Sequence, residues 1–286
     1  MAIGRADQVA IYSVAPSELA RAAVRLAQRV RVAERGARAS LLGQWGAASE
    51  VPFTVWRPEL RRTTPPTPGT LGRVAEAYLA LDGGRVVITG TAGAGKTVLA
   101  LELVMQLLDR WQQTRPVPVR LSLADWDPET QPFEAWLARQ IGDTYGVRQR
   151  HAAALVAQRL VLPVLDGLDE MDEDPDQPVM AVAAVRAVNR YQGYPQAAPL
   201  VITCRTELYE RLRRDSGGVA YASVAEIGDL DADHIRAYLE RSLAARSEPE
   251  TAGVGRRRRP ARRTPRRHPV DALAALPGHD RLLRWA

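Results

Sequence analysis

Apolar positions along the chain follow two alternating patterns, and together they predict an α/β domain. Short runs rich in β-branched residues predict strands at residues 51–56, 85–89, 117–123, 160–165 and 200–205. Longer segments with apolar residues at helical spacing predict helices at residues 17–42, 71–81, 98–108, 132–145, 151–159 and 179–191. Because most of the strands are separated by helices, we expect a parallel sheet sandwiched by helices, with a ligand at the carboxyl ends of the strands.

The amino-terminal helix is the most clearly amphipathic of these elements. Between Leu19 and Leu41 apolar residues recur every three or four positions with arginines interleaved, and Ser17 is a candidate helix cap. Two uses of the apolar face stay open: packing on the rest of the domain, or contact with a partner or an anionic membrane surface.

Residues 61–69, rich in threonine and proline, predict an extended linker. His151 has no second ligand at metal spacing, so we expect a surface residue near a helix start.

Composition places the chain among soluble globular proteins. The 286 residues are 46% hydrophobic and 25% charged, which excludes a wholly disordered chain and a collagen. The single cysteine, Cys204, cannot form an internal disulfide or build a cysteine-based metal site. No run reaches the roughly 18 apolar residues of a membrane helix, and the amino terminus lacks the pattern of a secretory signal. We therefore expect a cytoplasmic protein without a membrane span.

The net charge of +6 is unevenly distributed. Residues 251–286 hold ten arginines against two acids, a net of +8, which leaves −2 for residues 1–250. The run from Arg256 to Arg267 is rich in proline and has no aromatic residue, which predicts a disordered tail. Three interpretations of the tail stay open: a solvated segment, contact with nucleic-acid phosphates, or the product of a shifted reading frame.

Of the 39 basic residues, Lys96 is the only lysine. It belongs to the octapeptide Gly90-Thr91-Ala92-Gly93-Ala94-Gly95-Lys96-Thr97, which matches the P-loop pattern G-x-x-x-x-G-K-[ST]. A strand is predicted before this loop and a helix after it, as the motif requires. In such a loop the backbone N–H groups bind phosphate, the lysine reaches the β- and γ-phosphates, and the Thr97 hydroxyl ligates Mg²⁺. The sequence therefore predicts a nucleotide site at residues 90–97.

Acidic residues follow a later predicted strand. Asp166 ends this apolar run and is the candidate Walker B aspartate that holds Mg²⁺, although Pro163 costs the strand one ladder hydrogen bond. Asp169 and Glu170 come shortly after it and are candidate catalytic acids that orient or deprotonate the attacking water. Arg205 ends the next predicted strand. It is either a sensor of the γ-phosphate or a surface arginine.

With these motifs the chain resembles the NACHT family of signal-transducing P-loop ATPases, which belongs to the STAND class. The resemblance rests on the Gly90 to Thr97 loop, the block Leu162-Pro163-Val164-Leu165-Asp166-Gly167-Leu168-Asp169-Glu170, and the strand end Ile202-Thr203-Cys204-Arg205. A small residue after the Walker B aspartate, with acids two and three positions later, distinguishes NACHT proteins from most AAA+ relatives. The resemblance implies a P-loop NTPase fold of the ASCE/AAA+-like type that binds ATP or ADP with Mg²⁺. It also implies that Asp169, with Glu170 second, acts as the base and that Arg205 senses the γ-phosphate.

We therefore expect an amino-terminal helix, short strand and linker at residues 1–70, a NACHT NTPase domain at 71–246 and a disordered tail at 247–286. The expected function is an ATP-binding, slowly hydrolysing switch module that controls oligomerisation or effector assembly, with ATP-dependent homo-oligomers and unidentified protein partners. Two alternatives stay open: an AAA+-like ATPase acting on protein or nucleic acid, and a truncated nucleotide-binding fragment without switch activity. The second arises because relatives continue into a winged-helix region and sensor repeats, whereas this chain stops at Ala286.

Overall fold

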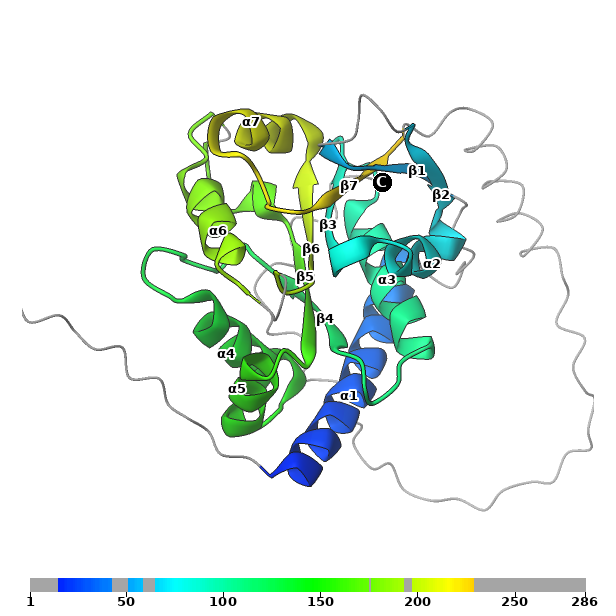
Figure 1. Ribbon diagram of the computed structural model, residues 1–286, viewed down its shortest axis with the longest axis vertical. Helices are drawn as coiled ribbons and strands as arrows, with labels where there is room; N and C mark the ends of the chain where they lie inside the picture. Colours follow the sequence, from blue (N-terminus) through cyan, green and yellow to red (C-terminus); the bar gives the residue numbers. More distant parts are fainter. Residues whose placement is uncertain (1–14, 43–50, 59–64, 175, 193–196, 229–286) are drawn as a thin grey trace, which may run out of the picture. The chain divides into compact units, whose positions relative to one another are not determined.

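Seven strands form one mixed sheet in the computed structural model, which describes residues 15–42, 51–58, 65–174, 176–192 and 197–228 (Figure 1). The strand order is β2-β1-β7-β3-β6-β5-β4. The strands are β1 Pro52–Trp56, β2 Thr67–Thr70, β3 Arg85–Gly90, β4 Val117–Ser122, β5 Val161–Asp166, β6 Leu200–Arg205 and β7 Ser223–Ile227. The strands from β7 to β4 are parallel to one another, whereas β1 is antiparallel to both β2 and β7. This confirms the expected α/β fold with a mostly parallel sheet.

Helices cover both faces of the sheet. Figure 1 shows α2 and α3 on one side and α6 and α7 on the other, with α4 and α5 beside β4. The α-helices are α1 Pro16–Leu42, α2 Val74–Leu79, α3 Lys96–Asp109, α4 Phe133–Tyr145, α5 Gln149–Ala157, α6 Val179–Asn189 and α7 Thr206–Ser216. Short 3-10 turns are η3 Leu71–Arg73, η4 Asp82–Gly84 and η5 Leu168–Glu170. The tail expected at residues 247–286 lies outside the described residues.

The parallel register brings three strand ends to one edge of the sheet. Gly90 at the end of β3 is opposite Arg205 at the end of β6. Asp166 ends β5, whose register with β4 pairs it with Ser122. Because β6 lies between β3 and β5, residues at its carboxyl end stand between the loop after β3 and Asp166. This edge is where an open parallel sheet binds its ligands.

Proline within β5 is compatible with the strand. Pro163 is opposite Val119 of β4, and the pairing of β5 with β6 starts one residue later, at Val164. The strand is buried up to its last residue. The lost N–H therefore costs one ladder position without interrupting the strand that carries Asp166.

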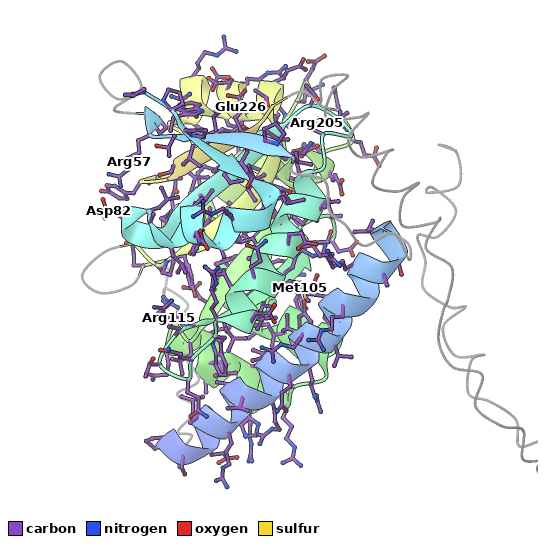
Figure 2. The ribbon with its side chains drawn as sticks, turned by 90° about the vertical axis from the view of Figure 1, so that its right-hand side faces the viewer. Arg57, Asp82, Met105, Arg115, Arg205 and Glu226 are labelled. Atoms are coloured by element: carbon purple, nitrogen blue, oxygen red, sulfur yellow. The ribbon has the colours of Figure 1, made fainter. Side chains whose placement is uncertain are left out.

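The first helix packs on the rest of the domain. This confirms the first of the two uses expected for its apolar face. Its buried residues recur at helical spacing: Ala22, Ala23, Leu26, Ala27 and Val30. They contact α3, β4, α4 and α5. Figure 2 shows α1 lying across the side of the domain, with Met105 of α3 beside it. The helix begins one residue earlier than expected, since Ala15 accepts the first helical bonds and Pro16, which needs no N–H partner, takes the first helical position.

His151 is buried, and the expectation of a surface residue is wrong. It lies on α5 under α1, with 5% of its surface exposed. Its Nε2 lies 2.7 Å from Oε1 of Glu18, which also accepts a bond of 2.9 Å from Arg150. A partner 133 residues away in the sequence explains why local pattern did not reveal this burial.

Part of the expected linker is a strand. Residues 67–70 form β2, which pairs with β1 from Thr67↔Val55 to Thr70↔Pro52. β7, which also was not expected, pairs with the other side of β1. Proline is acceptable in β2 because that strand is the outermost of the sheet, where one side of the backbone needs no partner. β1 and β2 thus extend the same sheet that carries the P-loop.

Candidate nucleotide-binding site

The loop between β3 and α3 has the backbone conformation that its glycines make possible. Gly93 and Gly95 have φ of 77° and 92°, values at which a side chain would be strained. A Cβ on Gly90 would lie 3.0 Å from Cβ of Ala94, so this position is closely packed. Each fixed glycine of the motif therefore has a geometric reason in this chain.

The start of α3 presents unpaired donors to the loop. Gly95 is the N-cap residue, and no side chain caps the helix. The first N–H groups of a helix have no acceptor within it, and they carry the positive end of the helix dipole. Nζ of Lys96 donates bonds of 3.2 and 3.0 Å to the carbonyls of Gly90 and Thr91, which folds the ammonium over the loop. In the described part of the chain Lys96 forms no ion pair, so its charge remains for an anion.

Asp166 is held by three side chains at the end of β5. Oγ1 of Thr203 donates a 2.6 Å bond to Oδ1 of Asp166 and accepts a 2.8 Å bond from the N–H of Gly167. Oγ1 of Thr97 lies 3.4 Å from the same carboxylate oxygen. Nη1 of Arg120 lies 3.2 Å from the other oxygen, Oδ2. The candidate metal ligands Thr97 and Asp166 are therefore neighbours, as the sequence predicts.

Arg120 joins Asp166 to the amino-terminal helix. Its Nε forms a 3.0 Å ion pair with Oε2 of Glu34, whose side chain is only 4% exposed. The hydroxyl of Tyr145 donates a 2.7 Å bond to the carbonyl of Arg120 and lies 3.4 Å from Oε1 of Glu34. Burial raises the pKa of this hydroxyl far above its ordinary value, so it remains a donor. A buried chain of polar groups thus runs from α1 to the metal-ligand candidate.

Arg120, Thr203 and Glu34 were not among the residues expected from sequence. A signal existed for the first two, because each is a polar residue inside an otherwise apolar strand. Glu34 carried no such signal, since it is one charge among many on an amphipathic helix.

Asp169 and Arg205 form an ion pair at the edge of the site. Nε of Arg205 lies 2.8 Å from Oδ2 of Asp169, and the N–H of Arg205 donates a 3.1 Å bond to Oδ1. The carboxylate is 7% exposed, whereas the arginine side chain is 54% exposed. The pair occupies both oxygens of Asp169 and leaves much of the guanidinium accessible.

Glu170 lies over Gly167, the residue that follows Asp166. Gly167 has φ of 87°, and a Cβ there would lie 2.9 Å from Oε2 of Glu170. Partial burial raises the pKa of Glu170, and the negative charges of Asp169 and Asp166 raise it further, while Arg205 lowers it. The glycine after the aspartate therefore gives the glutamate room to fold back toward the site.

The P-loop, Asp166 and the residues around Asp169 and Arg205 line one cleft of about 260 Å³. The predicted residues that line it are Ala92, Gly93, Gly95, Lys96, Thr97, Asp166, Asp169, Glu170 and Arg205, and Gly167 and Thr203 complete it. Gly90, Thr91 and Ala94 do not line the cleft; Gly90 and Thr91 contribute through the carbonyls that Lys96 holds.

The donor set of the cleft fits a nucleotide with Mg²⁺. An uncapped helix start and an ammonium group suit phosphate oxygens. A hydroxyl and a carboxylate, Thr97 and Asp166, are the oxygen ligands that Mg²⁺ prefers. On these grounds Lys96 and the loop would hold phosphate, and Thr97 and Asp166 would hold the metal ion.

A glycine-rich loop that opens a helix, with an aspartate at the end of a nearby parallel strand, defines a P-loop NTPase. Comparison with known protein families matches residues 84–246 to the NACHT domain. This match spans more than half of the 286 residues, so the chain belongs to the NACHT family, P-loop NTPases of the STAND class. Membership implies nucleotide binding. A comparison with curated proteins gives no match.

The match includes the whole cleft, whereas α1, β1 and β2 precede it. Among the helices that the structure describes, none is long and apolar enough to cross a membrane.

Proposed function

We propose that the chain is an ATP-dependent switch module that hydrolyses ATP slowly and controls assembly with copies of itself or with effector proteins. The observation that carries this proposal is the ion pair between Asp169 and Arg205 at the cleft. Family membership supports nucleotide binding and is consistent with hydrolysis. The switch function goes beyond what family membership supports and is our own proposal.

Arg205 connects the cleft to a structural element. It ends β6, and it is also the N-cap residue of α7. A terminal phosphate in the cleft would offer its accessible guanidinium a second anionic partner beside Asp169. Because α7 begins at the next residue, a movement of Arg205 changes the position of the first turn of α7. The nucleotide state is thereby reported to a surface helix.

The two acids after Asp166 have different surroundings, and we assign them different roles. Both oxygens of Asp169 are engaged by Arg205, which suits a residue that holds the sensor. Glu170 lines the cleft, its pKa is raised, and it forms no ion pair within the described part of the chain. We assign the transfer of the water proton to Glu170, which reverses the order that the family resemblance implies.

In the proposed reaction the water oxygen forms a bond to the γ-phosphorus, and the bond between that phosphorus and the β–γ bridging oxygen breaks. The water proton passes to the carboxylate of Glu170, and ADP and phosphate are the products. Mg²⁺ would neutralise phosphate charge from its ligands Thr97 and Asp166.

A matched pair of substitutions tests this division of roles. Glu170→Gln should slow single-turnover hydrolysis by on the order of 100-fold while the Kd for ATP stays nearly unchanged. Asp169→Asn should slow hydrolysis less and should change the ratio of ATP to ADP affinity, because Arg205 loses its partner. If Asp169→Asn is the slower variant and the affinity ratio is unchanged, Asp169 is the base and this part of the proposal is wrong.

Light scattering tests the switch itself. The parent chain should gain mass with ATP or a non-hydrolysable analogue and should not gain mass with ADP, whereas Lys96→Ala should stay constant. Tight binding at constant mass without turnover would identify a nucleotide-binding fragment. Turnover stimulated by unfolded protein or nucleic acid would identify an AAA+-like ATPase.

A further inference from the structure

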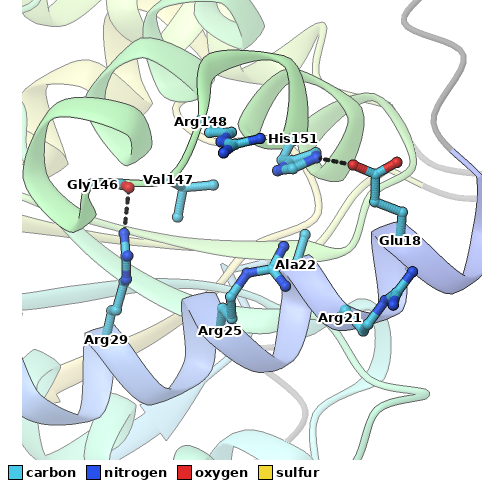
Figure 3. Close-up of a pocket in the computed structure, with 9 residues that line it drawn as sticks. All are labelled: Glu18, Arg21, Ala22, Arg25, Arg29, Gly146, Val147, Arg148 and His151. Atoms are coloured by element: carbon cyan, nitrogen blue, oxygen red, sulfur yellow. Dashed lines mark hydrogen bonds and ion pairs between the residues drawn. The ribbon is translucent and has the colours of Figure 1, made fainter.

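A second hollow, of about 510 Å³, lies between α1 and the start of α5 (Figure 3). It is separate from the nucleotide cleft and shares no residue with it. Its volume is in the usual range of small-molecule sites. The residues that line it are Glu18, Arg21, Ala22, Arg25, Arg29, Gly146, Val147, Arg148 and His151.

The lining is strongly basic. Arg21, Arg25 and Arg29 are spaced four residues apart on one face of α1, and Arg148 stands on the opposite wall (Figure 3). The one carboxylate of the lining, Glu18, is already shared by His151 and Arg150. Four guanidinium groups therefore surround a hollow in which no carboxylate is available to neutralise them.

Most arginines of α1 that lie in or near the hollow already have partners. Arg31 pairs with Asp109 and Arg38 with Glu102. Arg29 donates to the carbonyls of Tyr145 and Gly146, and Arg21 donates to the carbonyl of Ser17.

Among the residues that the structure describes, Arg25 and Arg148 form no ion pair or hydrogen bond through their side chains. They come from opposite walls of the hollow (Figure 3). Both residues are exposed, so solvent weakens their mutual repulsion, and an anion between them would interact with both charges.

The wall around Arg148 adds backbone donors. Arg148 is the N-cap residue of α5, a helix of nine residues, and no side chain caps its start. The first N–H groups of this helix, at Gln149 and Arg150, have no acceptor within the helix. The residue that starts this helix, Arg148, lines the hollow, so the positive end of the helix dipole lies at its wall.

We propose that this hollow binds a small polyphosphate, an anion with at least two linked phosphoryl groups. Guanidinium groups from both walls match several phosphoryl oxygens at once and bind them bidentately. No phenylalanine, tyrosine or tryptophan lines the hollow, and the imidazole of His151 is engaged by Glu18, so recognition rests on the phosphates and not on stacking of a base. The phosphates of inorganic polyphosphate and of a nucleotide share this chemistry.

The test uses the full chain in a background that removes two competing sites. Lys96→Ala weakens the P-loop, and glutamine in place of the eight arginines from Arg256 to Arg267 removes the basic tail. Inorganic tripolyphosphate is titrated into this protein by calorimetry at 0.15 M salt, where long-range attraction is screened. The variants are Arg25→Ala, Arg148→Ala and the double variant. Arg35→Ala is the matched control, because Arg35 is an exposed arginine of the same helix outside the hollow.

We expect one tripolyphosphate per chain, with roughly tenfold weaker binding for each single variant, further loss in the double variant and no change for Arg35→Ala. Titration of ATP into the same background protein distinguishes the two possible ligands. If ATP binds more tightly than tripolyphosphate, the hollow binds a nucleotide; if ATP binds more weakly, it binds the inorganic anion. Equal affinity of the double variant and Arg35→Ala, or no binding by the background protein, overturns the proposal. Binding of a single-stranded oligonucleotide without binding of tripolyphosphate also overturns it and assigns the surface to nucleic acid.

Discussion

Glu34 on the first helix and Arg120 on β4 form a buried ion pair, with Oε2 and Nε 3.0 Å apart. The same guanidinium reaches Asp166 through Nη1. An element that precedes the NACHT match therefore supplies the counter-charge for the arginine that orients the metal-ligand candidate. The amino-terminal helix is part of the site's support.

Removing one member of this pair should be costly. Arg120→Met leaves the Glu34 carboxylate buried without its partner, and we expect a loss of about 3–5 kcal/mol in the free energy of unfolding. The double variant Glu34→Gln with Arg120→Met should recover much of this loss, because the uncompensated charge is gone. Urea unfolding of the parent, both single variants and the double variant gives the coupling energy. Additive effects would show that the pair is not coupled.

The lone lysine should dominate phosphate affinity. Lys96→Ala removes the ammonium that lies over the loop, and we expect the Kd for Mg-ATP to rise by about 100-fold or more. Lys96→Arg should restore little, because a planar guanidinium does not replace a compact ammonium that is held by two loop carbonyls. Isothermal titration calorimetry measures both. Parent-like affinity in Lys96→Ala would exclude this loop as the nucleotide site.

A methyl group at position 167 should disturb the site more than the fold. Gly167→Ala imposes a positive φ on alanine, at about 1–2 kcal/mol, and brings its Cβ close to Glu170. We expect slower hydrolysis with nearly unchanged ATP affinity. Gly36→Ala is the control, since its Cβ would meet nothing within 4 Å on α1, and it should stabilise the protein by about 0.5–1 kcal/mol. Equal hydrolysis rates in Gly167→Ala and Gly36→Ala would show that Glu170 does not take part in the reaction.

The pH profile should report the surroundings of Glu170. A base acts when ionised, so the hydrolysis rate should rise with pH through the raised pKa of this carboxyl. Arg205 lowers that pKa, and Arg205→Met removes its charge. The pKa then rises, and the acid limb of the single-turnover profile should move to higher pH. If the acid limb does not move in Arg205→Met, or if it persists in Glu170→Gln, it reports the titration of another group.

Local sequence predicts those parts of the site that local structure creates. The P-loop, the strand that ends at Asp166 and the strand that ends at Arg205 are each a contiguous apolar run with its polar end, and all three were expected. Parallel register then brings their ends to one edge without further information. This is why nine of the twelve expected residues line one cleft, whereas Gly90, Thr91 and Ala94 do not.

Pairings between distant segments account for what the sequence did not reveal. Glu34 and Arg120 are 86 residues apart, and Glu18 and His151 are 133 apart. β2 has a composition typical of a linker and becomes a strand only because β1 lies beside it. In each of these cases a partner from elsewhere in the chain determines the burial or the conformation, and a single sequence does not identify that partner.

Both edge strands of the sheet that the structure describes have features that disfavour pairing with a further strand. At one end β2 is four residues long and contains Pro68, which cannot donate to a neighbouring strand. At the other end β4 contains Pro118, and α1 packs against this strand. Short edges, prolines and covering helices are the features that prevent edge-to-edge pairing between molecules. In the switch that we propose, copies of this domain would therefore associate through helices and loops and leave the sheet intact.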